Sequence, residues 1–206
     1  MSDFRIYAAC LSSYNAGRLH GVWIEASTDA DEMQEQVSAM LRTSPCPNTM
    51  IACVACDGGD AGPCQVCQGN GNLPSAEEWA VHDYDGSWPN FGETSDLKQI
   101  ADFMELVEEA EERGIDPDDV KDIVDHHGAH YLNAALLAIV DGYRGHYDNL
   151  ESYAEDFVEQ TTNLKAIPEH IRNYIDYESM ARDWKLNGDI FTIEASAGGI
   201  HVFDNH

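Results

Sequence analysis

The chain has 206 residues, of which 38 are acidic and 11 are Lys or Arg, so its formal net charge is −27. This charge excludes a surface that binds nucleic-acid phosphates, because nucleic-acid binding requires Lys and Arg to displace counterions. Hydrophobic residues form 43% and aromatic residues 9% of the chain, which is typical of a folded protein and not of a disordered acidic tail.

The N-terminal part of the chain, residues 1–92, is predicted to be a small α+β unit. Mixed β-branched and aromatic residues predict short strands at 4–11, 20–25 and 77–84. Between the second and third strands, Thr28 is predicted to cap the start of a helix. Apolar residues at intervals of three to four give that helix one buried face, and it stops before Pro45.

A Cys-, Gly- and Pro-rich island, residues 45–74, is inserted in this unit and carries two C-x2-C pairs. Each pair lets two thiolates from one tight turn reach a single tetrahedral ion. The island has too few large apolar side chains to pack its own core. We predict a zinc ion bound by Cys53, Cys56, Cys64 and Cys67. Its role is structural, because four thiolates leave no open position for substrate. The alternative is four reduced thiols in a flexible loop.

The middle of the chain, residues 93–138, is predicted to be an acidic helical unit. It holds thirteen acids and only three bases, Lys98, Arg113 and Lys121. A helix is expected over 95–113, where like charges at i,i+4 cost a few tenths of a kcal/mol per pair. A purely solvated face would interleave lysines, so a partner-binding surface is expected. Its predicted members here are Asp102, Glu105, Glu108, Glu109, Glu111, Glu112, Asp116, Asp118, Asp119, Asp122 and Asp125.

The last third, residues 139–206, is predicted to be a second α+β unit. Helices are expected over 147–159 and 177–185, and a terminal hairpin over 189–203. The first of these helices adds five carboxylates to the predicted surface, namely Asp148, Glu151, Glu155, Asp156 and Glu159. The fold class is therefore α+β, with short antiparallel sheets and acidic amphipathic helices.

No apolar run approaches the ~18 residues of a membrane-spanning helix. The start of the chain lacks the basic and then apolar order of a signal peptide. We therefore expect a cytoplasmic protein without membrane contact, and in that reducing compartment paired cysteines favour metal over disulfides. Of the other two cysteines, Cys10 is predicted to be a small buried hydrophobe and Cys46 a possible spare ligand.

The run Asp125-His126-His127, with His130 one turn later, offers a second reading as a DHH-type phosphoesterase centre. It lacks the separated aspartate motifs of a two-metal site, and a helix end whose histidines favour the negative dipole pole explains it as well. Nucleophile elbows, P-loops and Rossmann fingerprints are absent from the sequence. We therefore expect a protein that is not an enzyme.

Several stretches, in order and spacing, resemble the ArdA antirestriction proteins, which mobile elements carry to protect incoming DNA from type I restriction enzymes. These stretches are 6–11, 14–17, 21–24, 77–86, 142–157, 167–169, 174–183 and 201–203. The resemblance implies an elongated, three-part protomer that dimerises and displays carboxylates where bent DNA displays phosphates. The dimer would occupy the DNA path of the methyltransferase core of a type I restriction–modification enzyme. The cysteine island departs from the family pattern, in which a short loop stands at this place.

The charge is compatible with that reading, since DNA carries one charge per about 1.7 Å and the whole net charge would match at most about 46 Å of duplex. Two alternatives remain open. The acidity could be adaptation to a salt-rich cytoplasm, or the protein could be a zinc-stapled acidic adaptor that binds basic DNA-binding proteins. Composition alone does not separate these explanations.

Overall fold

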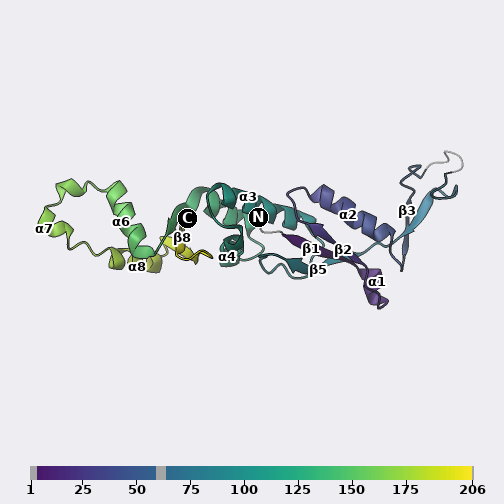
Figure 1. Ribbon diagram of the computed structural model, residues 1–206, viewed down its shortest axis with the longest axis horizontal. Helices are drawn as coiled ribbons and strands as arrows, with labels where there is room; N and C mark the ends of the chain where they lie inside the picture. Colours follow the sequence, from purple (N-terminus) through teal and green to yellow (C-terminus); the bar gives the residue numbers. More distant parts are fainter. Residues whose placement is uncertain (1–3, 59–63, 206) are drawn as a thin grey trace. The chain divides into compact units, whose positions relative to one another are not determined.

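The computed structural model describes residues 4–58 and 64–205, and it confirms an α+β fold with short antiparallel sheets (Figure 1). The described residues group into two compact units, one ending at Met104 and the other beginning at Glu105. The predicted division into three units, at 1–92, 93–138 and 139–206, stays a prediction.

The N-terminal unit is built on a three-stranded antiparallel sheet in the order β2-β1-β5. Its main elements are β1 (Arg5–Cys10), α1 (Leu11–Asn15), β2 (Gly21–Glu25), α2 (Ala30–Arg42), β5 (Trp79–Asp85) and the first part of α3 (Leu97–Glu112). Ile6 on the central strand pairs with Ile24 on β2, and both are fully buried. Helix α2 contacts β1 and β2 and contributes Met33 and Val37, which are also fully buried. This apolar core confirms the predicted strands and the predicted inner face of the helix.

The cap of α2 lies one residue later than predicted. Asp29, not Thr28, is the N-cap, and its carboxylate accepts hydrogen bonds from the backbone N–H groups of Asp31 (2.9 Å) and Glu32 (3.0 Å). These bonds satisfy donors that the first turn of a helix leaves unpaired. Both residue types suit the position, so the sequence pattern alone does not choose between them. The helix ends before Pro45, as predicted.

The cysteine island contains a hairpin that the sequence did not predict. β3 (Thr49–Ala52) and β4 (Asn72–Ser75) pair antiparallel and enclose the four cysteines between them. Pro74 obscured β4, because proline is tolerated only in edge strands, where no ladder bond is lost. Residues 59–63 of the predicted insertion at 45–74 lie outside the described residues. A two-stranded hairpin is marginal by itself, so this one needs further support.

The C-terminal unit is built on a second antiparallel sheet, in the order β6-β8-β7. Its elements are α4 (Pro117–His127), α5 (Leu132–Leu137), a π-helical turn (Ala138–Gly142), β6 (Tyr143–Tyr147), α6 (Leu150–Thr161), a 3-10 turn (Leu164–Ala166), α7 (Glu169–Arg172), α8 (Tyr177–Asn187), β7 (Ile190–Glu194) and β8 (Ile200–Asp204). Tyr153 of α6 packs with Ile190, Ile200 and Val202 of the sheet. The predicted terminal hairpin is confirmed as β7 and β8.

The acidic helix predicted over 147–159 begins at Leu150 instead. Asn149 caps it, and its side-chain oxygen accepts a hydrogen bond from the Ser152 backbone N–H at 3.0 Å. The residues before the cap form β6, which the sequence did not predict. Within the part of the chain that the structure describes, no helix is both long enough and apolar enough to span a bilayer.

Candidate metal centre and acidic surface

The two cysteine pairs adopt the same turn. Each pair is followed by a non-glycine residue and then a glycine, all with positive φ. These residues are Asp57 (50°), Gly58 (70°), Gln68 (54°) and Gly69 (85°). Two left-handed residues in succession reverse the chain tightly, and glycine adopts this conformation without a Cβ penalty. The two turns are linked where the Cys53 backbone N–H donates to the Gly71 carbonyl at 2.8 Å.

These turns bring the four sulfurs of Cys53, Cys56, Cys64 and Cys67 together. The Sγ–Sγ distance is 3.9 Å between Cys53 and Cys64 and 3.7 Å between Cys56 and Cys67, and all four sulfurs lie within 4.8 Å of one another. A tetrahedral ion with metal–sulfur bonds of about 2.3 Å places its sulfurs about 3.8 Å apart. Among residues 4–58 and 64–205, this is the one group of His, Cys, Asp or Glu side chains arranged to hold a metal ion.

The pKa values within this group diverge. Burial opposes ionisation of Cys67, but hydrogen bonds outweigh it, first that from the Gly71 backbone N–H at 3.3 Å, and lower the pKa of Cys67 to about 7. Burial, followed by the neighbouring thiol of Cys53, raises the pKa of Cys56 to about 12. Four crowded thiolates repel one another, so a cation is needed to hold all of them deprotonated together.

The two other cysteines lie outside this group. Cys10 is fully buried, as predicted, and its Sγ lies 3.2 Å from Ser12 Oγ and 3.3 Å from Ser44 Oγ. Burial opposes ionisation there, but the hydroxyl contacts prevail and lower the pKa of Cys10 to about 7. Cys46 does not join the four-sulfur group, so the prediction of a spare ligand at this position is wrong.

Helix α3 carries its acids and its apolar residues on different sides. The carboxylates that recur at intervals of three and four residues share one side. We name this set the α3 acidic face, which consists of Asp102, Glu105, Glu108, Glu109 and Glu112. The buried side contains Ile100, Phe103, Leu106, Val107 and Ala110. The apolar side fixes the helix in the fold, and the α3 acidic face is thereby held toward solvent.

Most of the predicted surface acids, those of the α3 acidic face included, are accessible. Those that are exposed are Glu105, Glu108, Glu111, Glu112, Asp116, Asp118, Asp125, Asp148, Glu151, Glu155 and Glu159. Those that are half-buried are Asp102, Glu109, Asp122 and Asp156. On α6 the exposed glutamates recur every four residues, which places them along one side of the helix.

The three cations of the middle segment each pair with one of these acids. The nitrogen–oxygen distance is 2.6 Å for Lys98–Asp102, 2.5 Å for Arg113–Glu109 and 2.6 Å for Lys121–Asp122. Such surface pairs contribute little to stability. They lower the local charge at three positions and leave the other acids to set the negative potential.

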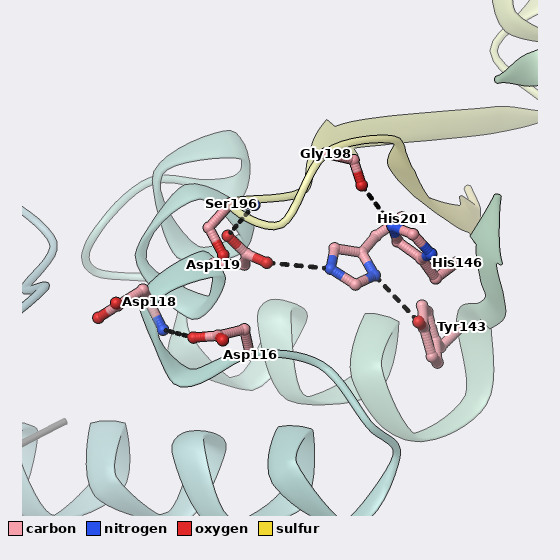
Figure 2. Close-up of polar contacts among 8 residues, drawn as sticks. All are labelled: Asp116, Asp118, Asp119, Tyr143, His146, Ser196, Gly198 and His201. Atoms are coloured by element: carbon pink, nitrogen blue, oxygen red, sulfur yellow. Dashed lines mark hydrogen bonds and ion pairs between the residues drawn. The ribbon is translucent and has the colours of Figure 1, made fainter. Parts of the chain in front are cut away.

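Asp119 is not part of this surface, which corrects its prediction. Its side chain is buried, with 3% of the residue exposed, and Figure 2 shows the carboxylate turned toward His201. His201 Nε2 lies 3.1 Å from Asp119 Oδ2, and the Ser196 backbone N–H donates to Oδ1 at 2.8 Å. His201 Nδ1 lies 2.9 Å from the Tyr143 hydroxyl. A buried carboxylate requires such partners; those of Asp119 come from β8 and from the turn between β7 and β8, and Tyr143 of β6 contacts His201 in turn.

The Asp125-His126-His127 run does not converge on a metal position. The His126 ring stacks on Phe191 with centroids 4.2 Å apart, and the His127 ring packs edge-on against the same side chain at 5.3 Å. Asp125 and His130 are exposed. The histidines therefore pack at the end of α4, which favours the helix-end interpretation over a phosphoesterase centre.

Comparison with known proteins places this molecule in a family. The family model described as antirestriction protein (ArdA) matches residues 6–197, which is nearly the whole chain. No curated protein matches the chain significantly. The matched range includes both acidic helices and the four-cysteine group, and the family is one of inhibitor proteins. The chain therefore belongs to the ArdA antirestriction protein family.

Proposed function

We propose that this protein inhibits type I restriction–modification enzymes by imitating DNA. The observation that carries the proposal is the α3 acidic face, whose carboxylates are held outward by an apolar opposite side. Carboxylates three and four residues apart on a helix are separated by about 5–6 Å, a spacing suited to replacing phosphates. The further exposed acids on α4 and α6 extend the negative surface.

The inhibition would be stoichiometric and would involve no catalysis. A homodimer would occupy the DNA path of the methyltransferase core, in the cytoplasm, and exclude the duplex. Attraction between an acidic surface and a basic groove accelerates encounter and weakens with salt. The protein itself would bind no nucleic acid, because like charges repel.

The dimer contact is proposed to involve apolar side chains that the fold leaves uncovered. Tyr131 is 66%, Leu137 60% and Val140 41% exposed, and they follow one another from the start of α5 into the π-helical turn. Large apolar side chains that lie together at a surface mark interaction sites. Light scattering on the purified protein and on a Leu137→Asp variant tests this contact, since the charge should favour the monomer.

The ion at the four cysteines is proposed to be zinc in a structural role. Zinc prefers four thiolates in a tetrahedron, and the sulfur separations agree with that geometry. Bound there, the ion would tie both C-x2-C turns together and support the β3–β4 hairpin. Four protein ligands leave no coordination position for a substrate.

A competition titration tests the proposed function. A type I methyltransferase would be held with labelled target duplex, and this protein added at low and at moderate salt. The test variant changes the five carboxylates of the α3 acidic face to their amides. The matched control changes five exposed acids elsewhere to their amides, namely Asp31, Glu32, Glu35, Glu77 and Glu78.

We expect the wild-type dimer to displace the duplex near one equivalent, less effectively as salt rises. The test variant should be weaker by roughly tenfold or more, and the control should lose much less. Full displacement of the duplex by the test variant would contradict the proposal that the α3 acidic face binds the enzyme. A duplex that stays bound at large excess of wild type would point instead to the acidic adaptor and to other basic partners.

A further inference from the structure

A hollow of about 780 Å³ opens in the N-terminal unit, between α1, the end of β5 and the loop that follows β5. We name it the α1–β5 hollow. Its described lining includes none of the four cysteines and none of the carboxylates of the α3 acidic face. Its walls are rich in aromatic and histidine side chains, which include Tyr14, His82, Tyr84, Trp88 and Phe91.

The loop that forms one wall is held in place by specific hydrogen bonds. The Tyr84 hydroxyl donates to the Gly92 carbonyl at 2.8 Å, and the Trp88 indole N–H donates to the Asp85 carbonyl at 2.9 Å. The Trp88 ring also packs against Phe103, with centroids 5.1 Å apart. Gly92 has φ of +67°, which favours glycine at this bend. The hollow is therefore preformed and does not depend on a ligand to order its wall.

The rim of the hollow offers an aromatic ring and a carboxylate, and no Lys or Arg lines it. Tyr14 is 54% exposed, and its ring meets the His82 ring edge-on with centroids 4.8 Å apart. Glu93 lines the same hollow, with its side chain 66% exposed and its Oε1 4.0 Å from His82 Nε2. Aromatic faces and carboxylates both attract cations, and among the described lining residues only His82 carries positive charge, and only when it is protonated.

We propose that the α1–β5 hollow receives an arginine side chain of the target enzyme. A guanidinium is planar, so it can stack on the Tyr14 ring while its N–H groups donate to the Glu93 carboxylate. A lysine ammonium lacks both the flat face and the fork of donors. The inference rests on the proposed function, because a groove that binds DNA is lined with such basic side chains.

The test combines the competition titration with direct binding of a short arginine peptide. The variants are Glu93→Gln, which removes the carboxylate, and Tyr14→Ala, which removes the ring. Both side chains are largely exposed, so the fold should survive. The controls are Glu35→Gln, an equal charge change on α2, and Tyr14→Phe, which keeps the ring. For direct binding, the His82 ring resonances are followed during addition of the arginine peptide or its uncharged citrulline counterpart.

We expect Glu93→Gln and Tyr14→Ala each to weaken displacement of the duplex by roughly 2- to 30-fold, and both controls to match wild type. The arginine peptide should shift the His82 resonances, and the citrulline peptide should not. Unchanged displacement by both variants, or equal shifts with citrulline, would overturn the arginine site while leaving the proposed function standing. A wild-type protein that displaces no duplex would instead overturn the proposed function, and with it this target.

Discussion

The cysteine group and the α3 acidic face both gather groups that carry negative charge when ionised, but they arrange them in opposite ways. The four sulfurs turn inward to within 4.8 Å of one another. The carboxylates of α3 point outward and are separated by turns of helix. Convergent anions require a cation at their centre, whereas divergent anions leave their charge available to a partner. This difference in orientation is why we propose a structural metal site for the cysteines and an interaction surface for α3.

The largest expected effect comes from removing the proposed zinc ion. Structural zinc in small sites supplies on the order of 10 kcal/mol of binding free energy, and a two-stranded hairpin is marginal by itself. Strong chelation, or Cys67→Ser, should expose the hairpin amides to hydrogen exchange while the β2-β1-β5 sheet stays protected. Mass spectrometry measures the metal content, and residue-resolved hydrogen exchange measures the protection of the hairpin amides. Cys46→Ser is the control and should keep the metal. Protected hairpin amides in a metal-free protein would contradict the prediction.

The second comparison is between Asp119 and an exposed acid of the same helix. Asp119→Ala leaves His201 buried without its carboxylate partner, and should lower the free energy of unfolding by about 3 kcal/mol. Asp125→Ala, at an exposed position, should change it by less than about 0.5 kcal/mol. Urea unfolding measures both. Equal values would mean that the buried pair adds nothing to stability.

The third prediction concerns what the acidic surface does to stability. Changing Glu105, Glu108 and Glu112 together to glutamine removes repulsion at i,i+3 and i,i+4 and leaves the ion pairs of Asp102 and Glu109 in place. The free energy of unfolding should rise by about 0.5–1 kcal/mol at low salt, and the gain should shrink as salt is added. A loss of stability would show that these carboxylates serve the fold and are not held there for a partner.

The smallest expected effect is a pH dependence at His127. Burial, and then the neighbouring His126, lower the pKa of His127. The unfolded chain therefore binds this proton at higher pH than the folded protein does. The contribution of His127 to the free energy of unfolding is fully present above the ordinary histidine pKa of ~6.5. It is lost as the pH falls through the pKa that His127 has in the folded protein. Urea midpoints between pH 8 and pH 5 should fall less steeply in His127→Phe. The exposed His130→Phe control should keep the wild-type slope.

Local patterns were sufficient for much of the fold. The apolar stripe of α2, the β-branched strands and the terminal hairpin follow from periods that a chain shows without any tertiary contact. Among the elements that the sequence did not predict, β4 and β6 escaped for local reasons. Pro74 hid β4, and the mixed composition of 143–147 hid β6, which lies just before the helix predicted over 147–159. At the start of α2, Thr28 and Asp29 were equally suitable N-cap residues by type, and only the backbone geometry distinguished them.

The sequence by itself determined which four cysteines come together, because C-x2-C spacing already sets where each pair of sulfurs can point. It also determined the acidic character of α3, because helix periodicity alone separates the carboxylates from the apolar side. Only the tertiary structure decided that Asp119 is buried, since His201 lies 82 positions away in the chain. The α1–β5 hollow likewise could not be predicted from the sequence, because its walls come from segments that only folding brings together. The spacing of residues within one element follows from the sequence, whereas tertiary packing determines which distant segments lie close together.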